Sequence, residues 1–168
     1  MRDSPIGTGL LSTHIRRSNV TITRKALCFV YGIIGLLALV GTWGNDLQYF
    51  RMGLGYIGFT VRFWEDTLAN PGTRSATVDL LFFSLAATVW MLLEARRLGM
   101  RWPWLYIVGS LLIAASVMYP LFLINRERAL AKGVPPDEGG GSLRVYDVIG
   151  IILLGITFTA YIWITLTR

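Results

Sequence analysis

The sequence has one cysteine, one histidine and few charges, and each shortage excludes a class of site or of protein. With only Cys28 and His14, the chain can form no internal disulfide and has too few ligands for a zinc or haem site, so we expect neither a metal nor a cofactor. Charged residues make up 15% of the chain, whereas roughly 25% is usual in a soluble domain. The phosphate-binding loop, the nucleophile elbow and the zinc-protease motif are missing as well. These shortages argue against a soluble metalloenzyme or nucleotide-binding enzyme.

Long hydrophobic runs are what the sequence has instead. Hydrophobic residues make up 54% of the 168 residues, and a helix needs about 20 of them to cross a hydrocarbon core of ~30 Å. The runs lack the polar stripe of a soluble helix. They predict helices at about 26–43, 75–95, 104–125 and 146–166. We therefore expect an all-α integral membrane protein, a four-transmembrane-helix bundle with both termini on the same side.

The segments outside these runs define the rest of the organisation. Residues 1–22 are polar and predict a flexible N-terminal tail, while 129–145, which contains Pro135-Pro136 and three successive glycines, predicts a flexible connector. Residues 23–168 then form a single membrane domain. In the first helix, small residues recur every three positions and favour the close approach of another helix. They are Gly32, Gly35, Ala38 and Gly41.

The segment 47–68 joins the first two helices and has a pattern of its own. Its apolar residues are spaced alternately three and four apart from Leu47 to Leu68, which predicts one apolar stripe if the segment is helical. Its glycines, and charges such as Arg62 and Glu65, disfavour a full crossing. We expect an amphipathic helix in the headgroup region or a re-entrant piece, and a structured loop is the alternative.

Asp79 is the carboxylate that most needs a partner. It lies about 6 Å inside the second helix, where a charge is costly unless it faces the bundle and is paired. If the helices cross the membrane in sequence, the first and third connections lie on the same face as Asp79. We expect polar residues on this face to clasp the helices together. They are Asp79, Asn70, Tyr119, Asn125 and Arg126.

The distribution of positive charges only slightly favours one orientation of the helices in the membrane. With the N-terminus inside, nine lysines and arginines lie inside and seven outside. This difference, together with the basic tail, favours a cytoplasmic N-terminus in the cell (plasma or inner) membrane. Because the basic residues flank the hydrophobic runs, we expect them to meet anionic lipid headgroups rather than nucleic acid.

Four short stretches together resemble a known family. They are Phe63-Trp-Glu-Asp-Thr-Leu-Ala-Asn70, Ser75-Ala-Thr-Val-Asp79-Leu-Leu, Glu94-Ala-Arg-Arg-Leu-Gly99 and Pro120-Leu-Phe-Leu-Ile-Asn-Arg126-Glu. Over about residues 27–128 the chain resembles the domain-of-unknown-function 2834 family of small bacterial and plant membrane proteins. The resemblance implies a compact helical membrane unit with no established activity, and it carries over no catalytic residue. The tail, the connector and the fourth helix fall outside it.

Three kinds of function fit these observations. Small size, short loops and the lack of a cofactor motif favour a non-catalytic accessory or scaffold subunit, with membrane lipids and other membrane subunits as partners. The alternative is a membrane enzyme acting on a lipid or isoprenoid, because a carboxyl group in a low-dielectric site can serve as a general acid. Its candidates are Asp79, Asp66 and Glu65. A transporter or a lipid- or pigment-binding module is the second alternative, although few polar groups lie mid-membrane.

Overall fold

The computed structural model describes residues 7–132 and 142–167, with side chains from residue 22 onward. The described residues form helices and no strand: α1 (Gly7–Arg51), α2 (Tyr56–Thr67), α3 (Pro71–Arg97), α4 (Pro103–Gly109), the π-helical turn η1 (Ser110–Ala114), α5 (Ala115–Ala131) and α6 (Val145–Thr167). Four segments are long and apolar enough to cross a membrane: Ile22–Arg51, Pro71–Arg97, Pro103–Ala131 and Val145–Thr167. The prediction of an all-α protein with four such segments is confirmed.

The third apolar segment is broken rather than straight. The sequence predicted a continuous helix over 104–125, but the chain breaks at Ala114, whose backbone is extended (φ −177°, ψ 137°). After this residue the chain reverses, and α5 packs antiparallel against α4. The rings of Tyr106 and Phe122 lie 5.6 Å apart across the two arms. α4 and η1 form one helical arm over residues 103–114, which at 1.5 Å per residue is at most about 18 Å long and is shorter than the hydrocarbon core of ~30 Å.

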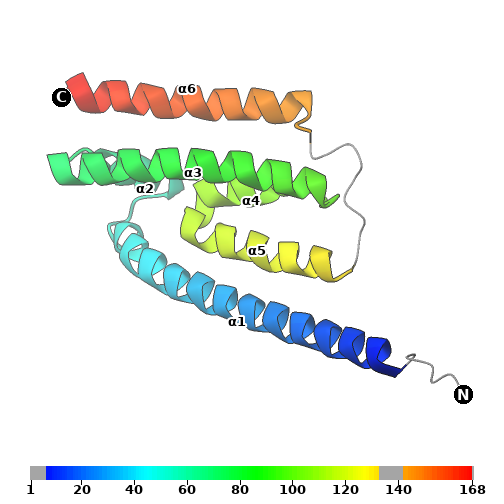
Figure 1. The fold of residues 1–168 in the computed structure, drawn as a ribbon. Coiled ribbons are helices and arrows are strands. Elements are labelled where there is room, and N and C mark those ends of the chain that lie inside the picture. The colour runs from blue at the N-terminus through cyan, green and yellow to red at the C-terminus, as the bar shows by residue number, and fades with distance from the viewer. Residues whose placement is uncertain (1–6, 133–141, 168) are drawn as a thin grey trace, which may run out of the picture.

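This hairpin changes which helix ends lie together. α3 finishes, α4 begins, α5 finishes and α6 begins at one end of the molecule, which we call the charged end (Figure 1). α1 finishes, α3 begins and α6 finishes at the other, which we call the aromatic end. α1 begins at the charged end and α6 finishes at the aromatic end (Figure 1), so these helix ends do not lie together as expected, and the membrane side of each terminus stays a prediction.

The packed core lies between α3, α4 and α5, where Leu92, Ile107 and Phe122 are buried against one another. α1 lies along the far side of α5, and a Cβ atom at Gly35 would make an ordinary contact with Pro120 at 3.6 Å. Gly32 and Gly41 have open space around them, so of the three glycines only Gly35 faces another helix closely. α6 packs on the opposite side of α3 (Figure 1).

The segment 47–68 is helical, but in two pieces. α1 ends at Arg51, Gly53 turns the chain with a positive φ of 72°, and α2 begins at Tyr56. Asn70 then caps α3 by accepting a hydrogen bond from the Thr73 N–H at 3.0 Å. On α2 the apolar residue Ile57 is 80% exposed, and an interfacial position for this helix stays a prediction.

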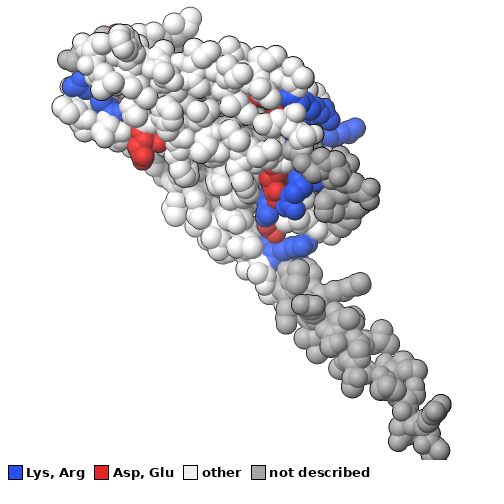
Figure 2. Space-filling view, turned by 45° about the horizontal axis from the view of Figure 1, so that its top comes forward, with Lys and Arg blue, Asp and Glu red and all other residues white. Residues whose placement is uncertain are grey.

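Two further predictions concern chain segments. α1 begins at Gly7, so helix enters the segment 1–22 that was assigned to a flexible tail, and the tail itself stays a prediction. The predicted connector 129–145 overlaps the ends of α5 and α6, and residues 133–141 lie outside the described residues. Between the two ends, the face shown in Figure 2 is a broad band free of charged side chains, as a lipid-facing surface requires.

Candidate functional site

The charged end is built around three buried carboxylates, and Glu94 is the first of them. Near the end of α3, it accepts hydrogen bonds from the Nη2 and Nε of Arg97 at 2.6 and 2.7 Å. The Nε of Arg126 on α5 donates to the same carboxylate at 2.6 Å. Arginine forms such paired bonds well because its N–H groups match the two carboxylate oxygens. Glu94 therefore ties α3 to α5.

Asp147 is the second carboxylate, and it is 0% exposed at the start of α6. Arg96 donates to both of its oxygens at 2.8 Å. The indole N–H of Trp104 donates at 2.8 Å and the backbone N–H of Arg144 at 3.0 Å. Four donors satisfy this buried charge, as burial requires. Asp147 thus joins α3, α4 and α6 at one point.

Glu127 is the third carboxylate, and it extends the contacts to α1. It accepts a hydrogen bond from the Nη1 of Arg126 at 2.7 Å, and the Nε of Arg24 lies 3.9 Å from its other oxygen. Together the seven residues form what we call the arginine–carboxylate network. They are Arg24, Glu94, Arg96, Arg97, Arg126, Glu127 and Asp147. Figure 2 shows blue and red side chains gathered at this end of the molecule.

A pocket of about 910 Å³ adjoins the network where α3 ends and α4 and α6 begin. Its wall contains three arginines and three large aromatic residues, and none of the described residues that line it is acidic. They are Arg96, Arg101, Arg144, Trp102, Trp104 and Tyr146. The pocket is therefore basic and aromatic, which suits an anionic group with an apolar neighbour.

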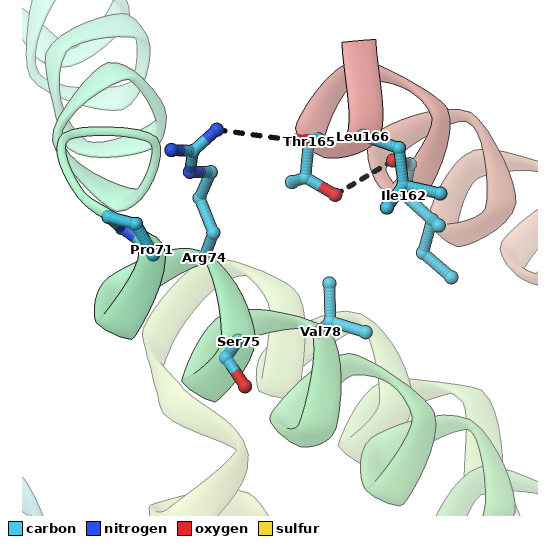
Figure 3. A pocket seen from close by; sticks show the side chains of 7 residues that line it. All are labelled: Pro71, Arg74, Ser75, Val78, Ile162, Thr165 and Leu166. Atoms are coloured by element: carbon cyan, nitrogen blue, oxygen red, sulfur yellow. Dashed lines mark hydrogen bonds between the residues drawn. The ribbon is translucent and has the colours of Figure 1, made fainter. Parts of the chain in front are cut away.

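A smaller pocket of about 300 Å³ lies at the aromatic end, between the start of α3 and the end of α6. Its one charged residue, Arg74, extends toward α6 and donates from Nη1 to the Thr165 carbonyl at 3.3 Å (Figure 3). The Nε of Arg74 is buried without a hydrogen-bond partner among the described residues. Most of the other lining side chains are apolar (Figure 3).

The predicted polar face is not assembled as expected. Asn70 and Asp79 lie at the aromatic end, whereas Asn125 and Arg126 lie at the charged end, and Tyr119 packs beside Trp90 at a ring distance of 6.0 Å. Arg126 pairs with Glu94, which is about 22 Å along α3 from Asp79. Arg126 and Asn125 therefore do not lie beside Asp79 among the described residues, because the reversal at Ala114 returns α5 to the end where α3 finishes. A clasp role for the predicted polar residues stays a prediction.

The three acids proposed for the enzyme alternative have different surroundings in the structure. Asp79 is exposed on α3 and forms no ion pair or hydrogen bond with a described residue. Asp66 on α2 accepts a hydrogen bond from the Tyr49 hydroxyl at 2.9 Å and lies 3.2 Å from Arg62. Glu65 is exposed beside the same arginine. Neither described pocket is lined by any of these three carboxylates.

The sequence did not predict Glu94, Asp147 and Trp104 as partners in a site. A straight third helix would have separated Glu94 from Arg126, and Trp104 from Asp147 on α6. One signal was available in the clusters of acidic and basic residues at Glu94–Arg97 and at Arg126–Arg128. Charged residues of opposite sign near the membrane tend to pair with one another, so two such clusters are candidates to meet. Among the described residues, no group of His, Cys, Asp and Glu could hold a metal ion.

Comparison with known proteins gives one match. The model of the family described as protein of unknown function DUF2834 matches residues 30–128. No curated protein and no solved structure matches the chain. The matched region contains Glu94, Arg96 and Arg126 but ends before α6 and Asp147.

Proposed function

Because the chain belongs to the DUF2834 family, whose function is unknown, we propose its role from the site alone. The protein is a small membrane protein with several candidate spans. Its proposed role is that of a non-catalytic accessory or scaffold subunit of a larger membrane complex. In this role the charged end holds the helices at fixed positions and carries out no reaction.

The observation that carries this proposal is the saturation of Asp147 and Glu94, two of the three buried carboxylates. Asp147 accepts four hydrogen bonds, from Arg96, Trp104 and the backbone of Arg144. Glu94 accepts three, and these three come from arginine side chains. A general acid or base needs an oxygen within hydrogen-bond reach of the substrate. These oxygens are already occupied by protein donors, and displacing arginine from a buried carboxylate is costly. The network therefore favours a structural role.

The enzyme alternative has less support. A lipid or isoprenoid enzyme would place its acid in a cleft that the substrate enters. The acids proposed for it, Asp79, Asp66 and Glu65, are spread over α2 and α3 and line neither described pocket. The transporter alternative needs polar groups along a path through the membrane. The two described pockets instead lie at opposite ends, with an uncharged band between them on the face of Figure 2.

The outer helices supply surface for a partner subunit. α1 packs mainly on α5 and α6 mainly on α3, so most of each helix faces outward. Exposed apolar residues on α6 include Leu153, Ile156 and Trp163. Lipid covers such a surface in a lone protein, and a second membrane helix covers it in a complex.

The charged end is proposed to face the cytoplasm of a cell whose plasma or inner membrane holds the protein. With the hairpin folded back, nine lysines and arginines of the described side chains lie near this end: Arg24, Lys25, Arg96, Arg97, Arg101, Arg126, Arg128, Lys132 and Arg144. Three lie near the other: Arg51, Arg62 and Arg74. Positive residues next to spans favour the cytoplasmic side. Counted over the same twelve residues, straight crossings place five on the side of the N-terminus and seven on the other, so the hairpin makes the asymmetry larger.

The subunit proposal is tested by purifying the tagged protein from its own membranes in a mild detergent. We expect a membrane protein to co-elute at a fixed ratio, measured by quantitative mass spectrometry, and to recover the chain when that partner is tagged in turn. Replacing Ile156 and Trp163 by alanine should lower this ratio, whereas alanine at Arg51 and Arg62, which lie on α1 and α2 rather than on α6, should not. A monodisperse protein without a fixed partner contradicts the proposal.

A further inference from the structure

The pocket at the charged end combines features that recognise a lipid phosphate. Its described lining is basic and contains no acid. Arg96 is already neutralised by Asp147, with two hydrogen bonds of 2.8 Å. The guanidinium groups of Arg101 and Arg144 form no ion pair with a described residue. Among the residues that the structure describes, two positive charges in this pocket therefore remain for a ligand.

Aromatic residues fix the position of the pocket relative to the membrane. Trp102 and Trp104 flank Pro103 at the start of α4, and paired tryptophans of this kind lie at the membrane–water interface. Trp102 is 77% exposed and has a positive φ of 62°, which is uncommon for a large side chain. Backbone conformations of this kind persist at ligand sites where the surrounding structure holds them.

Apolar surface continues from the mouth of the pocket along the outside of the helices. Leu105 on α4 and Val145 on α6 are exposed next to the lining residues. An acyl chain can lie on this surface while the phosphate occupies the pocket. A free phosphate ion would gain nothing from it.

We propose that the pocket formed by Arg101, Trp102, Trp104, Arg144 and Tyr146 binds the phosphate headgroup of an anionic phospholipid. Arg101 and Arg144 contact the phosphate oxygens, and arginine is suited to this because its donors match them in pairs. Tyr146, whose hydroxyl accepts hydrogen bonds from Arg96 and Arg144 at 2.8 and 2.9 Å, positions these side chains. This site is independent of the subunit proposal and stands whether or not the protein has a protein partner.

The test uses the full chain in detergent and a fluorescent phosphatidylglycerol as probe. We expect displacement by unlabelled phosphatidylglycerol at concentrations at least tenfold below those needed for phosphatidylcholine. Each arginine near a membrane surface is worth about fivefold in affinity, so replacing both Arg101 and Arg144 by glutamine should weaken binding about thirtyfold. The lysine pair at the same positions keeps the charge and should bind more tightly than the glutamine pair.

The matched control replaces Arg51 and Arg62 by glutamine, which removes the same charge from the other end of the molecule. This pair should bind the probe as the unaltered protein does, and all variants should stay folded, with no more than the small loss of stability expected for removing exposed charges. An equal loss of binding in the two glutamine pairs, or full binding by the Arg101 and Arg144 pair, overturns the proposal. Displacement by inorganic phosphate as effective as by phosphatidylglycerol overturns the lipid assignment, because it shows that the acyl chains contribute nothing.

Discussion

Different kinds of contact hold the helices together at the two ends of the molecule. At the charged end, buried carboxylates meet arginines from other helices at 2.6–2.8 Å. At the aromatic end, rings and hydroxyl groups make the contacts between helices. Phe50 and Phe59 stack at 4.8 Å, and the Tyr161 hydroxyl donates to Thr67 at 2.8 Å.

This difference separates charges that hold the fold from charges that only face solvent. Removing one partner of a buried ion pair costs about 3–5 kcal/mol, because the other charge is left without compensation. An exposed pair contributes about 0.2–1 kcal/mol. Arg96 and Asp147 belong to the first class, whereas Arg62 and Asp66, both more than a third exposed, belong to the second. We therefore expect stability to depend on the charged end.

The largest effect is expected from Asp147→Ala. The change leaves Arg96, Trp104 and a backbone N–H without their acceptor, so the free energy of unfolding should fall by about 3–5 kcal/mol. Asp147→Asn keeps an acceptor of similar shape and should lie between this variant and the unaltered protein. Thermal unfolding in detergent measures both. Equal stability of all three proteins would show that α6 is held by its apolar contacts alone.

A smaller effect is expected from Gly150→Ala. A methyl group at Gly150 would collide with the Trp104 ring, and moving that ring breaks its hydrogen bond to Asp147. Overpacking of this kind costs about 1–3 kcal/mol.

The matched control for that change is Gly155→Ala, on the same helix. There the new methyl group would lie 4.0 Å from Leu85, an ordinary contact. It should leave stability unchanged or raise it by up to about 1 kcal/mol, since alanine favours helix over glycine. If both variants unfold at the same temperature, Trp104 is not fixed against α6.

The smallest effect is expected from Arg62→Ala at the aromatic end. Its partners Glu65 and Asp66 lie 3.5 and 3.2 Å away on the same helix and remain exposed to solvent without it. Stability should fall by no more than about 1 kcal/mol, and less in high salt. A fall as large as that of Asp147→Ala would remove the contrast between the two ends.

Hydrophobic runs were sufficient to predict the helical class and the four apolar segments, because a long run without a polar stripe has few other structures. The predicted start of the second helix at about 75 is four residues late, because Asn70 caps α3 and Pro71 begins it. The reversal at Ala114 was not predictable in the same way. It lies within Ser110–Ala115, whose alanines and leucines favour a continuous helix. Packing of Tyr106 on Phe122 and of Arg126 on Glu94 overrides that preference.

The reversal at Ala114, which the sequence did not predict, also changes which residues lie together at the candidate site. A straight third helix places Arg126 beside Asp79, and a reversed one places it beside Glu94. Asp147 was recognised only as a residue flanking the fourth helix, since nothing local to it shows that Arg96 and Trp104 lie beside it. Long-range partners of buried charges depend on the path of the chain, which hydropathy alone does not determine.

The fold-back of Pro103–Ala131 is the central claim, and it is tested by the side on which Lys132 lies. In a Cys28→Ser background, single changes Lys25→Cys, Met52→Cys and Lys132→Cys are reacted with a membrane-impermeant maleimide in intact cells and in inverted vesicles. We expect position 132 to react from the same side as position 25 and from the opposite side to position 52. Reaction of position 132 from the side of position 52 would show that the third segment crosses the membrane, and would contradict the structure.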